Sequence, residues 1–254
     1  FVIKEPHVFD TKGECECGEI KKTETPQEPD RPKFEDIDED AWYREDVENA
    51  VEDGLFNGTG DNTFSPNKPI TRGMFVTVLA RMESNQIEEF ENVFDDVKKD
   101  AYYTRSINWA VANGIVTGFG DGKFGPDKEI TREAMALILY NYVNKFHKEV
   151  AKDTSKTIPF TDQYEVADWA QDAVLMLKEM EIIKGKSDGN YKPKGIVTRA
   201  EGAVILYRLS KKIKSTSKYY KPEDFGQNKP VMNSSSYSDA DWSNMEKELR
   251  KYLD

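Results

Sequence analysis

The chain has 254 residues and a mass of 29.1 kDa, with 37% hydrophobic and 33% charged residues, which is more polar than an average globular protein. Its 47 Asp and Glu residues outnumber 36 Lys and Arg residues, so the formal net charge is -11. This charge excludes non-specific binding to nucleic acid or to an anionic bilayer. A mean hydropathy of -0.74, with no long apolar run, excludes membrane insertion.

Residues 1–33 are interpreted as the end of a preceding domain followed by a linker, because Pro and charged residues dominate 21–33. The two cysteines, Cys15 and Cys17, lie here, and the chain has only two histidines, too few for a zinc site. We therefore expect no metal and no cofactor. The chain lacks an initiator Met and a signal-peptide pattern, and we interpret it as a fragment of a longer protein.

Four short motifs recur three times in the same order, which indicates an internal repeat. They are Phe-x-Asp, a Gly-rich loop that ends in Asp, an aromatic residue two positions before Pro, and an apolar residue before Thr-Arg. The three copies start at Phe34, Phe94 and Phe160. The predicted units are residues 34–93, 94–159 (with a linker) and 160–210. A polar tail, 211–254, carries a last amphipathic helix at roughly 239–253.

Each unit predicts a helix, a Gly-rich loop and a second helix, so the fold class is all-α. The first helices start near Trp42, Tyr102 and Trp169, and Gly54 and Gly114 end the first two. The second helices follow N-capping threonines, at Thr71, Thr131 and Thr198. In the third copy alone, Glu201 completes a capping box with Thr198. A helix pair is too small to bury its apolar face, so three repeats must pack together.

The arginine after each capping threonine carries the main functional argument. A helix N-terminus already bears partial positive charge, so Arg has the unfavourable sign there, yet it occurs in all three copies, as Arg72, Arg132 and Arg199. Helix-end amides together with a guanidinium form an anion site for a carboxylate or phosphate. The alternative is that each arginine pairs with an internal acid in a buried structural salt bridge.

The loop residues near these arginines have structural and functional interpretations that the sequence leaves open. Gly58, Gly118 and Gly185 permit close backbone approach or positive φ, and they would also line a groove beside the arginines. Asp61, Asp121 and Asp188 are expected to form turns by bonding their own backbone, and Asp61 and Asp121 are also candidate ligand-binding residues. The aromatic residues near the first helices are expected to be mostly core, while one at a groove edge, such as Trp109, would stack on a sugar ring.

Catalytic and calcium-binding functions find little support in the sequence. No segment fits the EF-hand pattern, although Asp36–Asp40 is rich in acids. The two histidines, at positions 7 and 147, supply no Ser–His–Asp or Cys–His set, and no acid pair recurs as expected for a glycosidase. We therefore expect that the chain is not an enzyme.

These motifs together resemble the S-layer homology domain, in three tandem copies that cover residues 34 to about 210. The copy from Trp109 to Gly118 and from Ile130 to Glu133 is the most similar. The resemblance implies a pseudo-threefold bundle with grooves between repeats. It also implies non-covalent anchoring of exported proteins to bacterial cell-wall polysaccharide, commonly through pyruvylated sugars, in an extracellular S-layer setting with other surface proteins as neighbours. A ketal pyruvate carries a carboxylate, which is one of the anions that the positions of the arginines predict as a ligand.

Two departures from the family pattern affect the expected grooves. Thr-Arg-Ala-Glu is intact only at 198–201. In the first and second copies, Met74 and Ala134 occupy the position of the Glu. If this Glu is a cap, its loss costs about 1 kcal/mol of helix stability; if it orients the arginine, the first two grooves are weakened. Lys186 and Ser187 replace the usual loop pattern in copy three, so that groove is expected to be degenerate. The alternative function is a helical protein-interaction scaffold without glycan affinity.

Overall fold

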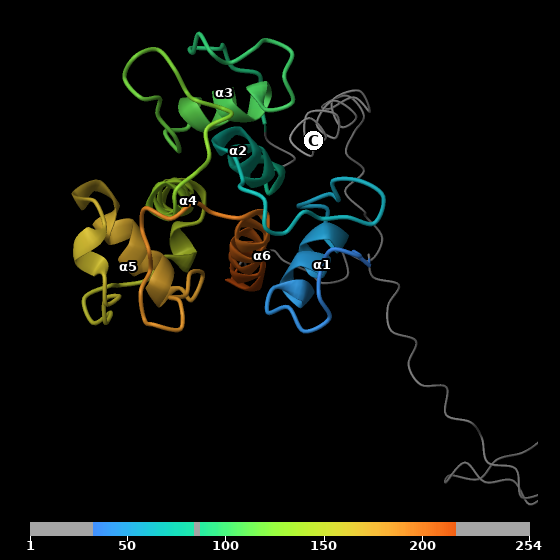
Figure 1. The fold of residues 1–254 in the computed structure, drawn as a ribbon. Helices are drawn as coiled ribbons and strands as arrows, with labels where there is room; N and C mark the ends of the chain where they lie inside the picture. Colours follow the sequence, from blue (N-terminus) through green and yellow to red (C-terminus); the bar gives the residue numbers. More distant parts are fainter. Residues whose placement is uncertain (1–32, 84–86, 217–254) are drawn as a thin grey trace, which may run out of the picture. The chain divides into compact units, whose positions relative to one another are not determined.

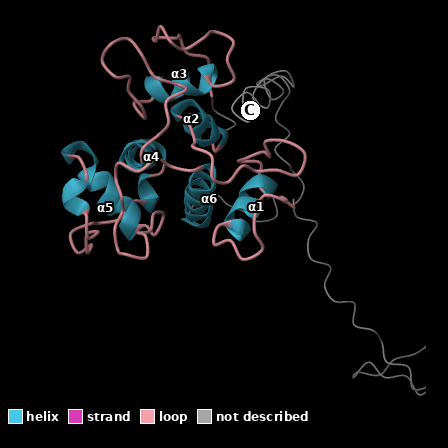
Figure 2. Cartoon of the chain, viewed as in Figure 1, coloured by secondary structure: helices cyan, strands magenta, loops and turns pink. Residues whose placement is uncertain are grey.

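The computed structural model describes residues 33–83 and 87–216. In this part of the chain the structure consists of helices and loops, with no strand beyond isolated bridges (Figure 2). The all-α prediction is confirmed. The predicted linker before residue 33 and the predicted helix at 239–253 lie outside the described residues.

Each predicted repeat contributes two α-helices, the second longer than the first. In chain order they are α1 (Arg44–Glu52), α2 (Arg72–Arg81), α3 (Thr104–Ala112), α4 (Arg132–Phe146), α5 (Gln171–Glu179) and α6 (Arg199–Thr216). Three short 3-10 turns follow α4: η1 (Lys148–Val150), η2 (Gln163–Glu165) and η3 (Asp168–Ala170). Helix α6 continues to Thr216, six residues past the boundary that the sequence predicted at 210.

The second helices begin as predicted, because the threonine hydroxyl oxygen accepts a hydrogen bond from the third helical amide. The distances are 3.2 Å from Met74 N to Thr71 Oγ1 and 3.3 Å from Ala134 N to Thr131 Oγ1. In repeat three, Glu201 N donates to Thr198 Oγ1, and Thr198 N donates to Glu201 Oε2, both at 3.2 Å. The predicted capping box is therefore confirmed in this repeat.

The first helices end at a residue in the left-handed region of φ. Gly54 and Gly114 both have φ of 71°, as expected for glycines that stop a helix. Repeat three has no glycine there, and Glu181 takes the same role with φ of 60°. A side chain in this conformation costs on the order of 1 kcal/mol, so α5 ends at an energetic cost that α1 and α3 do not carry.

The helices pair between repeats rather than within one. Helix α2 packs against α3, α4 against α5, and α6 against α1 (Figure 1). The second helix of each repeat thus packs against the first helix of the next, and the third repeat returns to the first. The sequence suggested that each repeat is itself a helix pair; the pairing across repeats explains how apolar faces that no single repeat covers become buried.

A closed cycle of backbone hydrogen bonds joins the three segments that precede the second helices. Ile130 N donates to Ile70 O, Val197 N to Ile130 O, and Ile70 N to Val197 O, at 3.0–3.1 Å. All three side chains are fully buried, at 0% exposure. Each of the three segments therefore donates one backbone bond to one neighbour and accepts one from the other. The pseudo-threefold symmetry of the bundle as a whole stays a prediction.

Within each repeat, the aspartate of Phe-x-Asp holds the loop in place. Both carboxylate oxygens of Asp96 accept backbone amides, from Phe124 and Gly125, at 2.8 Å each. Asp36 and Asp162 make the same pair of bonds to Phe64 and Ser65 and to Tyr191 and Lys192. These aspartates fix the loop that the arginine of the preceding repeat contacts.

Within the described residues, no helix combines the length and the apolar character needed to cross a membrane.

Candidate functional site

Each of the three arginines reaches out of its own repeat and docks on the loop of the next one. The Nε atom donates to the carbonyl of the loop aromatic residue, from Arg72 to Phe124 (3.1 Å), from Arg132 to Tyr191 (2.7 Å) and from Arg199 to Phe64 (2.9 Å). The Nη2 atom donates to the carbonyl of Thr117, Lys184 or Asn57, respectively. Each guanidinium also lies over the ring of that aromatic residue, with Cζ 4.5–4.7 Å from the centroid. This arrangement couples the repeats in a cycle.

The expectation that helix-end amides join the arginines at an anion is wrong for these helices. The first amide of α2, from Arg72, donates to Lys128 O, and the second, from Gly73, donates to Pro126 O. The third is taken by the capping threonine. The corresponding amides of α4 and α6 are used in the same way. Because a backbone N–H donates one bond, these amides are not available to a ligand.

The loop glycines do not supply amides that converge with the arginines either. The carbonyl that accepts Nη2 of Arg72 belongs to Thr117, and it shares a peptide unit with the amide of Gly118. No described peptide bond is cis, so the carbonyl and the amide point to opposite sides. The same holds for Gly58 and Gly185, which follow Asn57 and Lys184.

These glycines are needed for space, not for positive φ. A Cβ on Gly58 would lie 2.9 Å from Thr63 O and 3.3 Å from the Phe34 ring. On Gly185 it would lie 3.1 Å from the Phe160 ring, and on Gly118 it would overlap the Phe94 ring. The structural interpretation of the three glycines is therefore the one that the packing favours.

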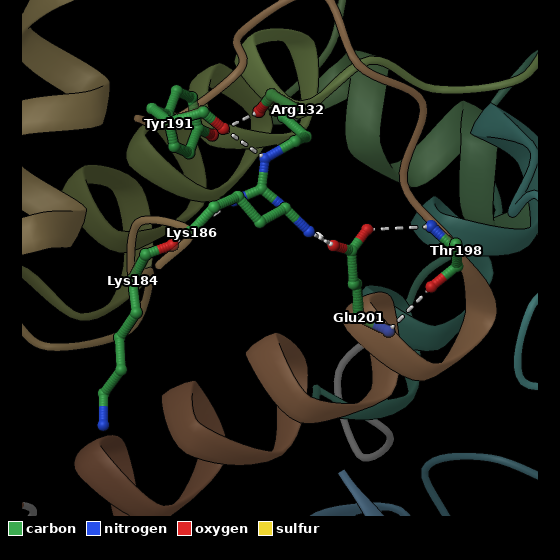
Figure 3. A network of polar contacts seen from close by, with 6 residues as sticks. All are labelled: Arg132, Lys184, Lys186, Tyr191, Thr198 and Glu201. Atoms are coloured by element: carbon green, nitrogen blue, oxygen red, sulfur yellow. Dashed lines mark hydrogen bonds and ion pairs between the residues drawn. The ribbon is translucent and has the colours of Figure 1, made fainter. Parts of the chain in front are cut away.

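The arginine that links repeats two and three has a full set of partners. Arg132 is 4% exposed, and its third nitrogen, Nη1, lies 3.1 Å from Glu201 Oε1 (Figure 3). Lys186 Nζ contacts the same oxygen at 2.5 Å. Burial opposes ionisation of Glu201, but the bond from Lys186, the Arg132 charge and the Thr198 amide outweigh it and lower its pKa. Glu201 therefore both caps α6 and neutralises the arginine of the preceding repeat.

Among the residues that the structure describes, the other two arginines have no carboxylate partner. Within residues 33–83 and 87–216, Nη1 of Arg72 and of Arg199 has no hydrogen-bond acceptor and forms no ion pair. The positions that correspond to Glu201 are Ala134, beside the Arg72 contact, and Met74, beside the Arg199 contact. Burial lowers the pKa of Arg72, and it lowers that of Arg199 to about 10; Asp96 and Asp36, respectively, oppose the shift. Of the two, Arg199 is only 5% exposed, while Arg72 is partly exposed.

Two of the three loop aspartates form turns, as expected. Asp121 Oδ1 accepts the Lys123 amide at 3.2 Å, and Asp188 Oδ1 accepts the Asn190 amide at 3.0 Å. The latter bond is the main reason why the pKa of Asp188 is lowered. Asp61 is exposed in the equivalent loop, and a ligand-binding role of Asp61 and Asp121 stays a prediction.

Trp109 lies in the core and offers no surface to a sugar. It is 2% exposed, and its ring stacks on Phe146 with centroids 5.7 Å apart. The exposed aromatic residues of the first helices are instead Trp42 and Trp169, at 64% and 53%.

Two kinds of residue that matter at these contacts were missed in the sequence. The aspartates of Phe-x-Asp were recognised as landmarks, but their role as amide acceptors needs the loop geometry. The residue after the loop glycine (Thr59, Phe119 or Lys186) has no role assigned from the sequence, apart from the departure noted at Lys186. Its variation among three otherwise similar loops was the available signal, since Phe119 lies over Arg72, with Cζ 4.8 Å from the ring centroid.

No group of three or more potential metal-binding side chains comes together in the described residues.

The sequence matches the model of the S-layer homology domain three times, at residues 33–73, 93–136 and 159–203. The chain belongs to the S-layer homology domain family. The three matches confirm the three tandem repeats, and members of this family serve in anchoring at the cell wall or surface layer, which is the location expected from the sequence.

Curated relatives of this S-layer homology chain include both surface proteins and enzymes. Exoglucanase XynX of Acetivibrio thermocellus is 33% identical over 70% of the chain but only 16% of the relative. Amylopullulanase of Thermoanaerobacterium thermosulfurigenes is 32% identical over 70% of the chain and 10% of the relative. The surface-layer 125 kDa protein of Lysinibacillus sphaericus is 32% identical over 72% and 15%. The chain thus matches about a sixth or less of these proteins.

Proposed function

We propose that this module anchors a surface protein non-covalently to bacterial cell-wall polysaccharide, and that arginine side chains at the repeat contacts hold an anionic, pyruvylated sugar of that polymer. The module has no catalytic role in this proposal; a catalytic or other cargo domain belongs to another part of the protein. Support for general surface anchoring comes from the family match and from relatives named as surface-layer proteins.

The observation that carries the ligand part is the incomplete pairing of two arginines. Arg72 and Arg199 each use Nε and Nη2 on main-chain carbonyls, which fix the guanidinium without neutralising it. A carboxylate from outside supplies the missing charge and an acceptor for Nη1, and charge-assisted bonds of this kind are strong. Arg132, already paired with Glu201, is the least suited of the three.

The test changes the ligand rather than the protein, because replacing an arginine also removes contacts between repeats. The 254-residue chain is mixed with purified cell-wall polysaccharide before and after mild acid removal of ketal pyruvate, and bound protein is measured by sedimentation. We expect binding to fall at least tenfold after the pyruvate is removed, which corresponds to about 1.4 kcal/mol.

Binding that is the same for both polymers would overturn the role of the anion and leave anchoring by neutral sugars. No binding to either polymer would favour the alternative function, a helical protein-interaction scaffold. Arg72→Ala, Arg132→Ala and Arg199→Ala, singly and combined, complete the experiment, and each variant's thermal unfolding is recorded so that loss of fold is not taken for loss of the ligand.

A further inference from the structure

The chain contains two Asn-Gly pairs, Asn57–Gly58 and Asn113–Gly114. In such a pair the peptide nitrogen of the glycine can attack the side-chain carbon of the asparagine, because glycine has no Cβ to obstruct the approach. The reaction needs a peptide N–H that is free to lose its proton and a side-chain amide that is free to move. The two pairs differ in both respects.

Asn113–Gly114 is held in an unreactive arrangement at the end of α3. The Gly114 amide donates to Val111 O at 2.9 Å, so the attacking nitrogen is occupied. Asn113 Nδ2 donates to Trp109 O, also at 2.9 Å, and this bond fixes the group that would leave. Both bonds have to break by local opening before this pair reacts.

Asn57–Gly58, in the loop of repeat one, has neither restraint. Within residues 33–83 and 87–216, the Gly58 amide and the Asn57 side-chain amide form no hydrogen bond. Both residues are partly exposed, so water reaches the pair. This pair is therefore the one that can react in the folded chain.

Arg199 makes the peptide between Asn57 and Gly58 more acidic than an ordinary one. Its Nη2 atom donates to Asn57 O at 3.0 Å, and this carbonyl shares a peptide unit with the Gly58 N–H. When the nitrogen loses its proton, negative charge spreads onto that oxygen, where the guanidinium stabilises it. Burial lowers the pKa of Arg199 only to about 10, so the guanidinium stays charged at neutral pH.

We infer that Asn57 is a site of spontaneous modification, at which the chain converts its own asparagine to isoaspartate. The Gly58 nitrogen loses its proton to solvent and bonds to Asn57 Cγ. The Cγ–Nδ2 bond then breaks, and the nitrogen takes a proton from water and leaves as ammonia, which gives a succinimide ring.

Water opens the ring at the former main-chain carbonyl carbon of Asn57, because Arg199 polarises that carbonyl. The bond from this carbon to the Gly58 nitrogen breaks, so the chain now runs through Cβ and Cγ, and the former carbonyl becomes a carboxylate. The net change consumes one water and releases one ammonia.

The product supplies Arg199 with a carboxylate partner. The oxygen that accepts its Nη2 is the one that becomes charged, so an ion pair replaces a bond to a neutral carbonyl. The contact between repeats three and one then resembles the contact between repeats two and three, where Glu201 pairs with Arg132. Newly made and aged copies of the module therefore differ at this contact.

The test follows the full chain over days in mildly alkaline buffer made with heavy-oxygen water. Digestion and mass spectrometry give the rate at each Asn-Gly pair, and an isoaspartate methyltransferase distinguishes isoaspartate from aspartate. We expect isoaspartate with one heavy oxygen to dominate at Asn57, and Asn113 to react at least about tenfold more slowly. In urea that unfolds the chain, the two rates should become equal, and Asn57 should react about threefold more slowly than in the folded chain, because Arg199 no longer contacts its peptide.

Two variants exchange residues between equivalent loop positions. Asn57→Thr installs the residue of repeat two, which keeps the main-chain carbonyl and should abolish the reaction. Thr117→Asn creates an Asn-Gly pair where Thr117 O accepts Nη2 of Arg72 at 3.1 Å, and it should add a second reactive site with the same preference for isoaspartate. Thermal unfolding should show both variants folded.

The outcomes bear on separate parts of the inference. If Asn57 reacts no faster than Asn113 in the folded chain, the site is overturned. Slower reaction at Asn57 in the folded than in the unfolded chain, or a product that is mainly aspartate, overturns the part assigned to Arg199. None of these results touches the anchoring function, since the reaction needs no ligand.

Discussion

The Glu201 carboxylate and the Arg132 guanidinium, from consecutive repeats, meet at 3.1 Å in a contact that encloses both side chains. The sequence left open whether this glutamate caps its helix or orients an arginine. It does both, with one oxygen for each role, and the arginine it serves belongs to the repeat before its own. The replacement of Glu in repeat two therefore concerns Arg72, and the replacement in repeat one concerns Arg199.

Replacing Glu201 by Gln should lower the free energy of unfolding by about 1–3 kcal/mol at neutral pH, because Arg132 then loses its buried charge partner. The folded state lowers the pKa of Glu201, so its stabilising contribution is present above the ordinary value of 4.5 and is lost as pH falls through the folded value. Urea unfolding at neutral pH and at about pH 3 checks this. The difference between the two proteins should shrink in acid; an equal difference at both pH values would contradict the assignment.

Ala134→Glu should restore in repeat two what Glu201 supplies in repeat three. A capping box at Thr131 adds about 1 kcal/mol to the free energy of unfolding, and the new carboxylate faces Arg72. We expect a more stable protein that binds pyruvylated cell-wall polysaccharide more weakly. Ala134→Gln keeps the cap without the charge and is the control. Should Ala134→Glu bind the polysaccharide as tightly as the unchanged chain, Arg72 does not hold the carboxylate.

The loop-holding aspartates predict a second stability effect. In Asp162→Asn, one of the two carboxylate acceptors for the amides of Tyr191 and Lys192 becomes a donor, which leaves a buried amide without a partner. The free energy of unfolding should fall by about 1–3 kcal/mol. Asp188→Asn, in the same loop but at an exposed turn, should leave the melting temperature nearly unchanged. Calorimetry of both variants decides whether Asp162 has the role that its bonds indicate.

The helix end at Glu181 offers a stabilising substitution. Glu181→Gly relieves a left-handed φ of 60° and should raise the free energy of unfolding by about 1 kcal/mol. Gly114→Glu makes the reverse change at the matching position, where a Cβ meets no atom within 4 Å, so only φ is altered. Its stability should fall by a similar amount. Denaturant unfolding measures both; shifts of the same sign would rule out φ as the cause.

Local features were predictable because they depend on neighbours in sequence. Three threonine caps, the capping box at Glu201 and the glycine ends of α1 and α3 follow from propensities that act over one helical turn. The partner of each helix was not predictable in this way. Which second helix packs on which first helix depends on contacts between different repeats, and the sequence motifs contain no information about these contacts.

The arginines show why the site was only partly predictable. Their unfavourable position at a helix end predicted either an external anion or an internal acid, and among the described residues only Arg132 has such an acid, Glu201. Charge reasoning pointed to an anion, but the structure supplies main-chain carbonyl oxygens first, at Phe124, Tyr191 and Phe64. Carbonyl oxygens carry no signature in a sequence, since every residue has one. The three contacts differ in the side chain beside each arginine, such as Phe119 beside Arg72. This difference can be recognised when the three loop sequences are aligned.

The cycle of bonds among Ile70, Ile130 and Val197 also bears on how many copies such a module can contain. In an open stack of repeats, units are gained or lost one at a time at either end, and each change alters the stability by a similar increment. Here the third copy returns to the first, so a copy cannot be removed without leaving a backbone donor and an acceptor of the cycle without their present partners. We therefore expect the three copies to unfold together rather than one at a time.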